Sequence, residues 1–320
     1  MHYLVSYETG QAAPWRAGVV WDYMLVDLSQ APGLALDSSR TGEPVSVRSF
    51  LARSKHERED ILAWAMHQLD SGDYSIGLDQ VTLGPPVPDP EKIICVGLNY
   101  LDHAAEAGAD VPVVPTIFAK FRNSLVGPTS PIMLPTVSTL IDYEGELAVV
   151  MGTRCKGVSQ QEALDYVAGY TVCNDISARD LQMQTSQWTA GKALDTFAPM
   201  GPGIVLSADI PDPQTLLLTT RVNGMVVQQS STANMIFSVA AIIAFLSSFM
   251  TLEAGDIIAT GTPAGVGGKR RPPLFLRDGD VVEVEIERIG TIRNRVLAPI
   301  LVAGKTAQAS FVQEVQHPKR

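Results

Sequence analysis

Short strand patterns and one amphipathic helix dominate the first 84 residues. Apolar and polar positions alternate in His2–Tyr7 and in Gly18–Leu28, which predicts short strands because side chains on a strand point alternately to its two faces. Apolar residues then recur at helical spacing from Arg53 to Asp70, and Gly72 follows as a helix terminator. The apolar stripe of this helix consists of Ile61, Trp64, Ala65 and Leu69. We therefore predict a small α/β N-terminal domain over residues 1–84.

A proline-rich segment separates this unit from the rest of the chain. Pro85, Pro86, Pro88 and Pro90 place four prolines within six residues, a density that neither a helix nor a central strand tolerates. We predict a linker over residues 85–91, a larger domain over residues 92–305 and a polar tail over residues 306–320.

Strand patterns outnumber helical patterns in the larger unit. The predicted strands are Lys92–Val96, Thr116–Lys120, Glu146–Met151, Tyr166–Cys173, Gly203–Leu206, Leu216–Val222, Asp256–Ala259, Val281–Ile286 and Ile292–Val296. The predicted helices are Leu101–Ala107, Gln160–Val167, Ala178–Gln184 and Ile236–Phe249. Because the helices do not alternate regularly with the strands, the pattern favours a mostly-β α+β fold over a doubly wound sheet.

One uncharged stretch is long enough to span a bilayer. The twenty residues from Ala233 to Leu252 carry no charged side chain. Their largest side chains recur at helical spacing, however, and Asn234 and Ser238 are among several polar residues in the stretch. The pattern therefore favours a buried or half-buried helix, and we predict no membrane contact.

Charge and cysteine content narrow the class of function. The 24 basic and 34 acidic residues give a net charge of −10, and no basic stripe exists that would suit a nucleic acid. An acidic protein that binds an anion needs a metal ion or a few focused basic side chains. Cys95, Cys155 and Cys173 form no CxxC pair, and the first residues show no signal-peptide pattern, so we predict a cytoplasmic protein without disulfides.

The first candidate site is the acidic run from Asp142 to Glu146. Residues two apart on a strand point to the same face, so Asp142, Glu144 and Glu146 would project side by side. Carboxylates this close repel one another unless a cation or protons intervene. A solvated strand edge is the alternative for any Glu-x-Glu pair, but the apolar strand that follows favours a functional cluster.

A second candidate follows the apolar strand that ends at Cys173. Asp175 could either cap the next helix or supply a third metal-ligating oxygen. Arg179 and Gln182 would share one face of that helix, which suits a carboxylate-bearing ligand because arginine binds carboxylates through two hydrogen bonds. The alternative for Arg179 is an ion pair with Asp175 at i, i+4 spacing.

A third candidate is a short helix that contains His103 and Glu106. At three residues apart, the two side chains would be neighbours. A carboxylate beside a histidine orients the ring and raises its basicity, as a general base requires. The same spacing also occurs in ordinary surface pairs.

Two loops complete the set of candidates. Lys192 follows a glycine and precedes a turn-rich stretch, so its amino group could point into a site or lie in solvent. The glycines between Gly261 and Gly267 would let backbone amides approach an anion closely. This loop is not a Walker A motif, and it could also be an ordinary connection between strands.

Taken together and in order, six segments resemble the fumarylacetoacetate hydrolase superfamily, in particular its bacterial acylpyruvate hydrolases. The segments are VGLNYLDHAAE, FAKFRNSLVGP, IDYEGELAVVMG, YTVCNDISARDLQ, GKALDTFAPMGP and GDIIATGTPAGVG. The resemblance runs from about Ile93 to Ile300, and the residues before it look like the variable N-terminal extension of longer members. It implies a catalytic domain with a mixed β-roll and flanking helices, usually in a homodimer.

The resemblance also implies a metal centre. In the family, a Glu-x-Glu pair and the aspartate of the Asn-Asp motif hold a divalent cation. Here Glu144, Glu146 and Asp175 match these positions. Ligation by oxygen alone suits Mg²⁺ or Mn²⁺, with Ca²⁺ as an alternative.

Further roles follow from the same resemblance. The matched water-activating pair is His103 and Glu106, and Lys192 matches the lysine that stabilises developing negative charge. The matched substrate contacts are Arg179, Gln182, Thr262, Lys120 and Tyr100. Leu98 stands where some relatives have an arginine, so some substrate contacts are expected to differ here.

These roles imply a metal-dependent hydrolase. The expected substrate is a 2,4-dioxo acid, an acylpyruvate such as fumarylpyruvate, whose carboxylate and 2-oxo group the cation would chelate. Water activated by His103 would attack C4, and cleavage of the C3–C4 bond would release pyruvate and a carboxylic acid. Decarboxylation of an oxaloacetate-type diacid and isomerisation of a hydroxymuconate-type diacid are alternatives on the same scaffold. A non-catalytic ligand-binding protein is a third.

Overall fold

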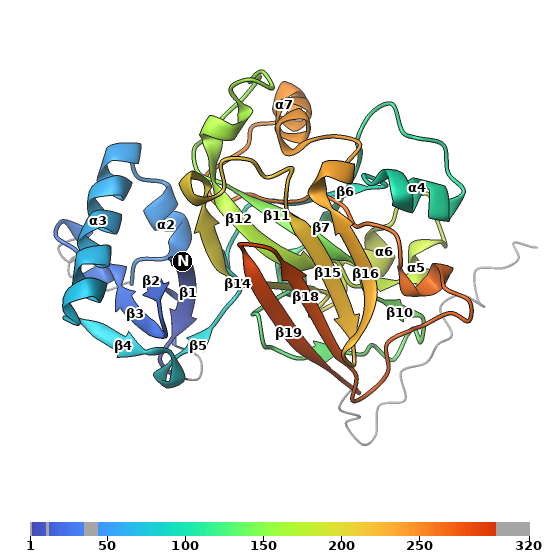
Figure 1. Cartoon of the computed structure of the whole chain (residues 1–320), viewed down its shortest axis with the longest axis horizontal. Coiled ribbons are helices and arrows are strands. Elements are labelled where there is room, and N and C mark those ends of the chain that lie inside the picture. Colours follow the sequence, from blue (N-terminus) through green and yellow to red (C-terminus); the bar gives the residue numbers. More distant parts are fainter. Residues whose placement is uncertain (1, 11–12, 35–43, 299–320) are drawn as a thin grey trace, which may run out of the picture.

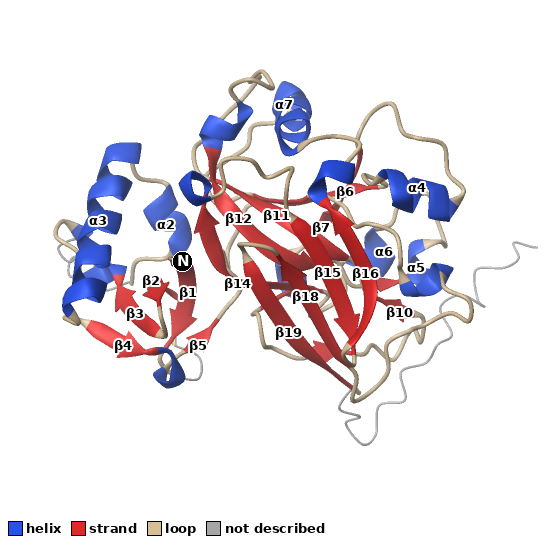
Figure 2. Ribbon diagram, viewed as in Figure 1, coloured by secondary structure: helices blue, strands red, loops and turns tan. Residues whose placement is uncertain are grey.

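Strands form the body of the molecule, and most helices lie at its periphery (Figure 2). The computed structural model describes residues 2–10, 13–34 and 44–298, so the predicted polar tail lies outside the described residues. The prediction of a mostly-β α+β fold is confirmed.

Within the described residues, twelve strands form one long mixed sheet. Its main path runs through β4 (Ser75–Gly77), β3 (Met24–Asp27), β2 (Arg16–Trp21), β1 (Tyr3–Glu8), β14 (Ala198–Leu206), β12 (Val167–Asn174), β11 (Gly145–Met151), β17 (Ile257–Ala259), β6 (Ile93–Gly97) and β7 (Thr116–Lys120). The side strands are β5 (Thr82–Leu83), paired with β1, and β8 (Leu125–Val126), paired with β14. The sheet passes from the N-terminal elements, drawn in blue in Figure 1, into the larger unit because β1 pairs with β14.

A second sheet packs against the middle of the long one. Its strands are, in spatial order, β16 (Met225–Ser231), β15 (Leu217–Val222), β18 (Val281–Ile286), β19 (Gly290–Leu297) and β9 (Ile132–Met133). Leu147 and Val149 of β11 share an apolar core with Leu218 and Val284 of this sheet. The sheets approach so closely at Gly145 that an added Cβ would lie 2.2 Å from the Thr220 hydroxyl oxygen, which explains the glycine between two glutamates.

Six α-helices are found in the described residues. They are α2 (Val47–Leu51), α3 (Lys55–Ser71), α4 (Leu101–Ala107), α5 (Arg179–Gln182), α6 (Thr189–Lys192) and α7 (Val239–Phe249). The predicted helix near residues 53–70 is α3, where Ser54 and Glu57 form a capping box and Gly72 ends the helix with a φ of 77°.

The uncharged stretch from Ala233 to Leu252 supplies a packed helix. Only α7 within it is an α-helix, and Val239, Ile242 and Leu246 of this helix are buried in the core beside β11 and β12. Within the described residues, no helix combines the length and the apolar content that crossing a bilayer requires.

The N-terminal elements share a core with the larger unit. Leu4 and Phe50 belong to the same apolar cluster as Val150 of β11 and Ala259 of β17. The predicted linker is packed as well, since Val87 is completely buried. The domain boundaries at residues 84 and 91 stay a prediction.

One predicted helix was wrong, and several elements, among them strand β16, were not predicted. The helix predicted over Gln160–Val167 is only one 3₁₀ turn over Ala163–Tyr166, because Val167 already pairs with Met151 in the sheet. Strand β16 was missed because its polar Gln-Gln-Ser-Ser run gives little apolar alternation on the edge of the second sheet.

Candidate active site

Two neighbouring strands bring the three predicted metal ligands together. Glu144 precedes β11, Glu146 lies within it, and Asp175 directly follows β12. The strands are antiparallel with Gly145 opposite Asn174, so these chain segments meet at one end of the pair. The Asp175 amide donates to the Glu144 carbonyl oxygen at 2.8 Å. One carboxylate oxygen from each of the three buried acids lies within 4.8 Å of the other two.

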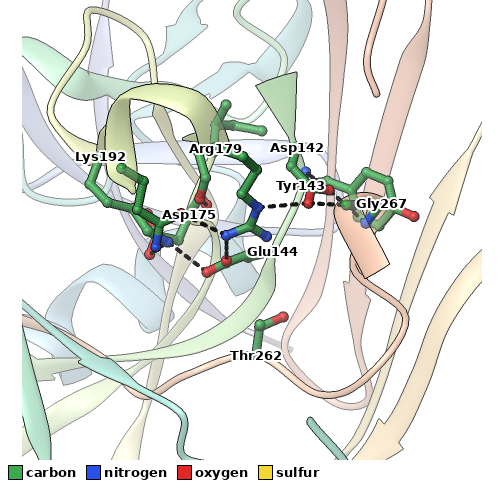
Figure 3. Close-up of polar contacts among 12 residues, drawn as sticks. Asp142, Tyr143, Glu144, Asp175, Arg179, Lys192, Thr262 and Gly267 are labelled. Carbon is green, nitrogen blue, oxygen red and sulfur yellow. Dashed lines mark hydrogen bonds and ion pairs between the residues drawn. The ribbon is translucent and has the colours of Figure 1, made fainter. Parts of the chain in front are cut away.

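Three cationic side chains surround this carboxylate triad of Glu144, Glu146 and Asp175. Lys192 Nζ lies 2.7 Å from Glu144 Oε2 and 2.7 Å from Asp175 Oδ2 (Figure 3). Lys120 Nζ contacts Asp175 Oδ1 at 2.6 Å, and Arg179 Nη1 contacts Glu144 Oε1 at 2.6 Å. Lys192 is therefore buried in the site and does not lie in solvent.

Glu146 is the member of the triad that lacks a cationic partner. Among the described residues it forms no ion pair, and Oε2 accepts one hydrogen bond, from the Gly261 amide at 2.8 Å. Burial, together with the charges of Asp175 and Glu144, raises the pKa of Glu146 well above its usual range. Burial alone would also raise the pKa of Glu144, but Lys192 and Arg179 outweigh it and hold that pKa below its ordinary value.

The donor set fits a divalent cation. Its ligand atoms are all carboxylate oxygens, which magnesium, manganese and calcium ions prefer. The formal charges of the cluster also leave room for a positive ion, because three cations and four carboxylates sum to 3 − 4 = −1. The contributing residues are Lys120, Arg179 and Lys192, with Asp142, Glu144, Glu146 and Asp175.

Asp142 does not join the triad, so the prediction that three carboxylates project side by side was wrong. Strand β10 (Ile141–Asp142) ends at Asp142 and pairs with β13 (Ser177–Ala178), whereas β11 begins only at Gly145. The alternation of side chains is therefore interrupted between the two strands. The Asp142 carboxylate instead accepts hydrogen bonds from backbone amides and from Arg179.

The triad opens into a cavity of about 410 Å³. This volume suits a small organic ligand. Its polar lining residues include His103, Glu144, Glu146, Arg179, Gln182, Lys192, Thr262 and Lys269. Its large apolar lining residues include Leu98, Phe118, Met183, Trp188, Val266 and Phe275.

His103 and Glu106 lie on α4 at the cavity. His103 Nδ1 is 3.4 Å from Glu106 Oε2, and only His103 lines the cavity. The Gly265 amide donates to both oxygens of Glu106, at 3.0 and 3.1 Å. Burial opposes ionisation of Glu106, but His103 and the Gly265 amide hold its pKa below the usual value. The carboxylate is thus fixed behind the ring, the arrangement that orients a general base.

The predicted substrate contacts fall into two groups. Arg179, Gln182 and Thr262 line the cavity. Arg179 Nη1 donates to Gln182 Oε1 at 3.0 Å, so these residues share a face as predicted. Arg179 pairs with Asp142 and Glu144 rather than with Asp175.

Lys120 and Tyr100 lie behind the cavity wall. Neither lines the cavity. Lys120 is fully buried. Its Nζ donates to Asp175 Oδ1 at 2.6 Å and to the Ile176 carbonyl oxygen at 3.1 Å. The Tyr100 hydroxyl is buried and has no hydrogen-bond partner within the described residues. Burial and the charge of Glu146 raise its pKa. Lys120 therefore supports the triad from behind, whereas Tyr100 makes no side-chain hydrogen bond to it among the described residues.

The helix cap and glycine loop differ from their simplest interpretations. Asp175 does not cap α5, whose N-cap is Ala178. The amides of the loop from Gly261 to Gly268 do approach anions closely, but these anions are carboxylates of the chain itself.

Several cavity residues were missed in the sequence. Lys269 lies in a short basic run that looks like ordinary surface charge. For Trp188 the sequence offers only an indirect signal, the glycine at position 97. An added Cβ at Gly97, the last residue of β6, would lie 2.3 Å from the indole ring. Phe118 and Phe275 gave no signal that separates a cavity wall from a core.

The fold and the site define a class of protein in which a carboxylate triad suited to a divalent cation opens into a small-molecule cavity on a mixed β-sheet core. Residues 92–297 match the family model described as fumarylacetoacetate (FAA) hydrolase C-terminal. The chain belongs to this fumarylacetoacetate hydrolase family, which is enzymatic. The predicted FAH-type fold is thereby confirmed.

Relatives within the family carry different reaction names. The mitochondrial oxaloacetate tautomerase fahd2 of Xenopus laevis is 46% identical over 79% of this chain and 79% of that protein. A fumarylacetoacetate hydrolase structure from Exiguobacterium antarcticum is 36% identical, covers 93% of this chain and 100% of that one, and has a TM-score of 0.74. A maleylpyruvate hydrolase structure from Sphingobium sp. SYK-6 is 31% identical and has a TM-score of 0.75. The match covers 93% of this chain and 100% of that one.

Proposed function

We propose that this chain is a divalent-cation-dependent enzyme that interconverts the keto and enol forms of a small 2-oxo diacid of the oxaloacetate type. One observation carries the proposal: Glu144 and Glu146 of the carboxylate triad, together with Lys192 and His103, line one cavity. The tautomerase relative at 46% identity supports the choice of reaction over the predicted hydrolysis.

Glu144, Glu146 and Asp175 are the residues that would hold the cation. Bound there, it would polarise a 2-oxo group as a Lewis acid and lower the barrier to removing the neighbouring C3 proton. His103 is the cavity base that would take the C3 proton and, as the imidazolium, would deliver a proton to the 2-oxygen to give the enol; the same transfers in reverse order would regenerate the keto form. Lys192 would stabilise the negative charge that develops on the substrate oxygen, because it is already held beside the triad without access to water.

Two cationic groups support a substrate with a second carboxylate. Arg179 Nη2 is buried and has no hydrogen-bond partner within the described chain, while the other guanidinium nitrogens are occupied. Lys269 lines the cavity and forms no ion pair with any described residue. A dicarboxylate would supply acceptors for both the triad end and these cations.

Hydrolysis of an acylpyruvate is the second candidate. The fixed His103–Glu106 pair favours it, since an oriented imidazole can also activate water for attack on a C4 carbonyl. The structural similarity to a maleylpyruvate hydrolase points to the same reaction class. Both candidates use the same cavity groups and differ in whether His103 acts on a carbon-bound proton or on water.

An assay of three separate signals tests the proposal. Purified protein with Mg²⁺ or Mn²⁺ is given oxaloacetate, and the enol absorbance, CO₂ release and pyruvate release are followed separately. A panel of acylpyruvates is tested for pyruvate release in parallel. We expect enzyme-accelerated enol decay without matching CO₂ release. Acylpyruvate cleavage without any acceleration of oxaloacetate enolisation would overturn the tautomerase proposal in favour of the hydrolase.

We also propose a cytoplasmic homodimer. The three cysteines are free and buried, which suits a reducing compartment, although the Xenopus relative is named as mitochondrial. Val113, Ile117 and Phe121 form an exposed apolar group at and around edge strand β7, and Val113 is 92% exposed. Light scattering should give twice the monomer mass, and a monomer at working concentration would contradict the dimer.

A further inference from the structure

The buried carboxylate of Asp142 joins two walls of the cavity. Its Oδ1 accepts the amides of Gly267 at 2.7 Å and Tyr143 at 2.8 Å. Its Oδ2 accepts Arg179 Nε at 2.8 Å (Figure 3). The same oxygen accepts the Gly268 amide at 2.8 Å. Asp142 itself is completely buried and does not line the cavity.

We propose that Asp142 is a positioning residue that holds Arg179 and the glycine loop as one anion-binding unit. The bond to Nε fixes the guanidinium plane, so that Nη1 reaches Glu144 and Nη2 is left without a hydrogen-bond partner. The same carboxylate fixes Gly267 and Gly268. The spacing between the arginine and the loop wall is thus set by one side chain.

The loop is shaped to accept this carboxylate. An added Cβ at Gly267 would lie 2.7 Å from Asp142 Oδ1 and 1.9 Å from the Leu274 carbonyl oxygen. An added Cβ at Gly268 would lie 3.3 Å from Asp142 Oδ2 and 3.7 Å from Arg179 Cγ. The Leu274 carbonyl oxygen thus leaves no room for a side chain at Gly267, and a side chain at Gly268 would crowd the acid.

A ligand anion would depend on this arrangement. Without the bond to Nε, the guanidinium is free to rotate and to turn more of its N–H groups toward Glu144, because both side chains are buried and oppositely charged. The group offered to a ligand carboxylate would then be misplaced or occupied. Loss of Asp142 should therefore weaken binding of the anion more than it slows the chemical step.

Asp142→Asn tests this directly. An amide has one acceptor oxygen, so it cannot satisfy the donors at both Oδ1 and Oδ2, whereas its size is unchanged. Asp256→Asn is the matched control, since Asp256 is equally buried, accepts the amides of Lys92 and Glu253 at 3.0 and 2.7 Å, and pairs with Lys92 Nζ at 2.8 Å. Asp256 does not line the cavity.

Three measurements are made on the full chain with Mg²⁺. Oxalate affinity by calorimetry should fall roughly 10- to 100-fold in Asp142→Asn, the range for loss of a charged hydrogen bond, and stay near wild type in Asp256→Asn. The KM for oxaloacetate should rise in the same range, with kcat falling far less. Amide exchange should accelerate at Gly267 or Gly268 in the first variant and at Lys92 and Glu253 in the second.

Of the three measurements, only the KM for oxaloacetate rests on the proposed function. If the wild-type protein does not act on oxaloacetate, that function fails, while oxalate affinity and amide exchange still judge Asp142. Unchanged oxalate affinity in Asp142→Asn, or equal losses in both variants, would overturn the proposal. If Asp142→Asn does not fold, Gly268→Ala crowds the same carboxylate, and it should weaken oxalate binding in the same direction; unchanged affinity in that variant would overturn the proposal too.

Discussion

Carboxylates at the two ends of the cavity are held in different ways. At the triad end, Glu144 and Asp175 contact the side-chain cations Lys120, Arg179 and Lys192. At the glycine-loop end, Asp142 and Glu106 accept backbone amides of residues 265–268, although Asp142 also accepts Arg179 Nε.

The difference separates Glu144 and Asp175 from Asp142 and Glu106, whereas Glu146 of the triad has no cationic partner among the described residues and accepts only the Gly261 amide. Long side chains can rotate, so carboxylates paired with them can change partners when a cation or a substrate binds. Backbone amides in a packed loop cannot move away, so the acids bound to them fix the cavity wall. Residue type alone does not separate these roles, because aspartate and glutamate occur at both ends.

The largest expected effect is loss of the cation at the triad end. Treatment with EDTA should abolish activity, and Mg²⁺ or Mn²⁺ should restore it, because without a cation at the triad nothing would polarise the 2-oxo group of the substrate. Glu144→Gln and Asp175→Asn should each weaken cation affinity by at least about 10²-fold in calorimetry. Full activity in a sample shown to be metal-free would contradict this role for the triad.

Removing the cavity base should produce the next largest loss. His103→Ala is expected to lower kcat by about 10²–10⁴-fold, the usual contribution of a positioned general base. Cation affinity should stay near wild type, because His103 is not part of the triad. The reaction is measured as enol decay and, for acylpyruvates, as pyruvate release. Unchanged rates in both assays would show that His103 lines the cavity but does not act as a base.

Lys192 and Lys120 form a sharper comparison within the triad end. Both contact Asp175 and both are buried, but only Lys192 lines the cavity. Lys192→Met should lower kcat by about 10²–10³-fold, as expected when a group that stabilises developing negative charge is removed. Lys120→Met should instead mainly lower stability, by about 3–5 kcal/mol for a broken buried pair. Thermal melts should show a loss of stability in both variants, because Lys192 also contacts two buried carboxylates, so kcat is the measurement that separates them. A larger loss of kcat in Lys120→Met than in Lys192→Met would show that the assignments are reversed.

The fold was largely predictable because buried strands leave a strong pattern. Strands β7 and β18 and helix α4 coincide with their predicted bounds, since each combines clear periodicity with a turn or glycine at its end. Strand β16 could not be found, because an edge strand with a polar exposed face has no apolar alternation. Pairing of β1 with β14 is a long-range contact that local pattern does not encode.

The candidate site was predictable where function depends on residue type at fixed spacing. Spacing singled out Asp142, Glu144 and Glu146 and left Asp175 open as a helix cap or a metal ligand. The family resemblance selected Glu144, Glu146 and Asp175, and the structure brings these three together. The position of Asp142 was not predictable, because two residues between β10 and β11 break the alternation that the sequence suggests. Lys269 and Trp188 reach the cavity only through tertiary packing.

Glu106 tests how much an amide-bound acid contributes. Glu106→Gln keeps one oxygen for the Gly265 amide but removes the charge behind His103. We expect kcat to fall no more than about 10-fold, the low end for a group that orients another. A loss as large as that of His103→Ala would mean that the charge of Glu106, rather than its placement of the ring, carries the effect.

Lys269 should give the smallest and most selective effect. It is an exposed side chain carried on the loop that Asp142 and Glu106 fix, and it forms no ion pair with the described residues. Solvent screening limits such a contact to about 1 kcal/mol, so Lys269→Met should lower kcat/KM for oxaloacetate by roughly 5-fold. Acetylpyruvate, a 2,4-dioxo acid with an acetyl group in place of the second carboxylate, is the matched substrate and should be turned over as in the wild type. Because the variant leaves the triad and His103 in place, an equal loss for both substrates would show that Lys269 acts through general electrostatics or loop packing and does not recognise a second carboxylate.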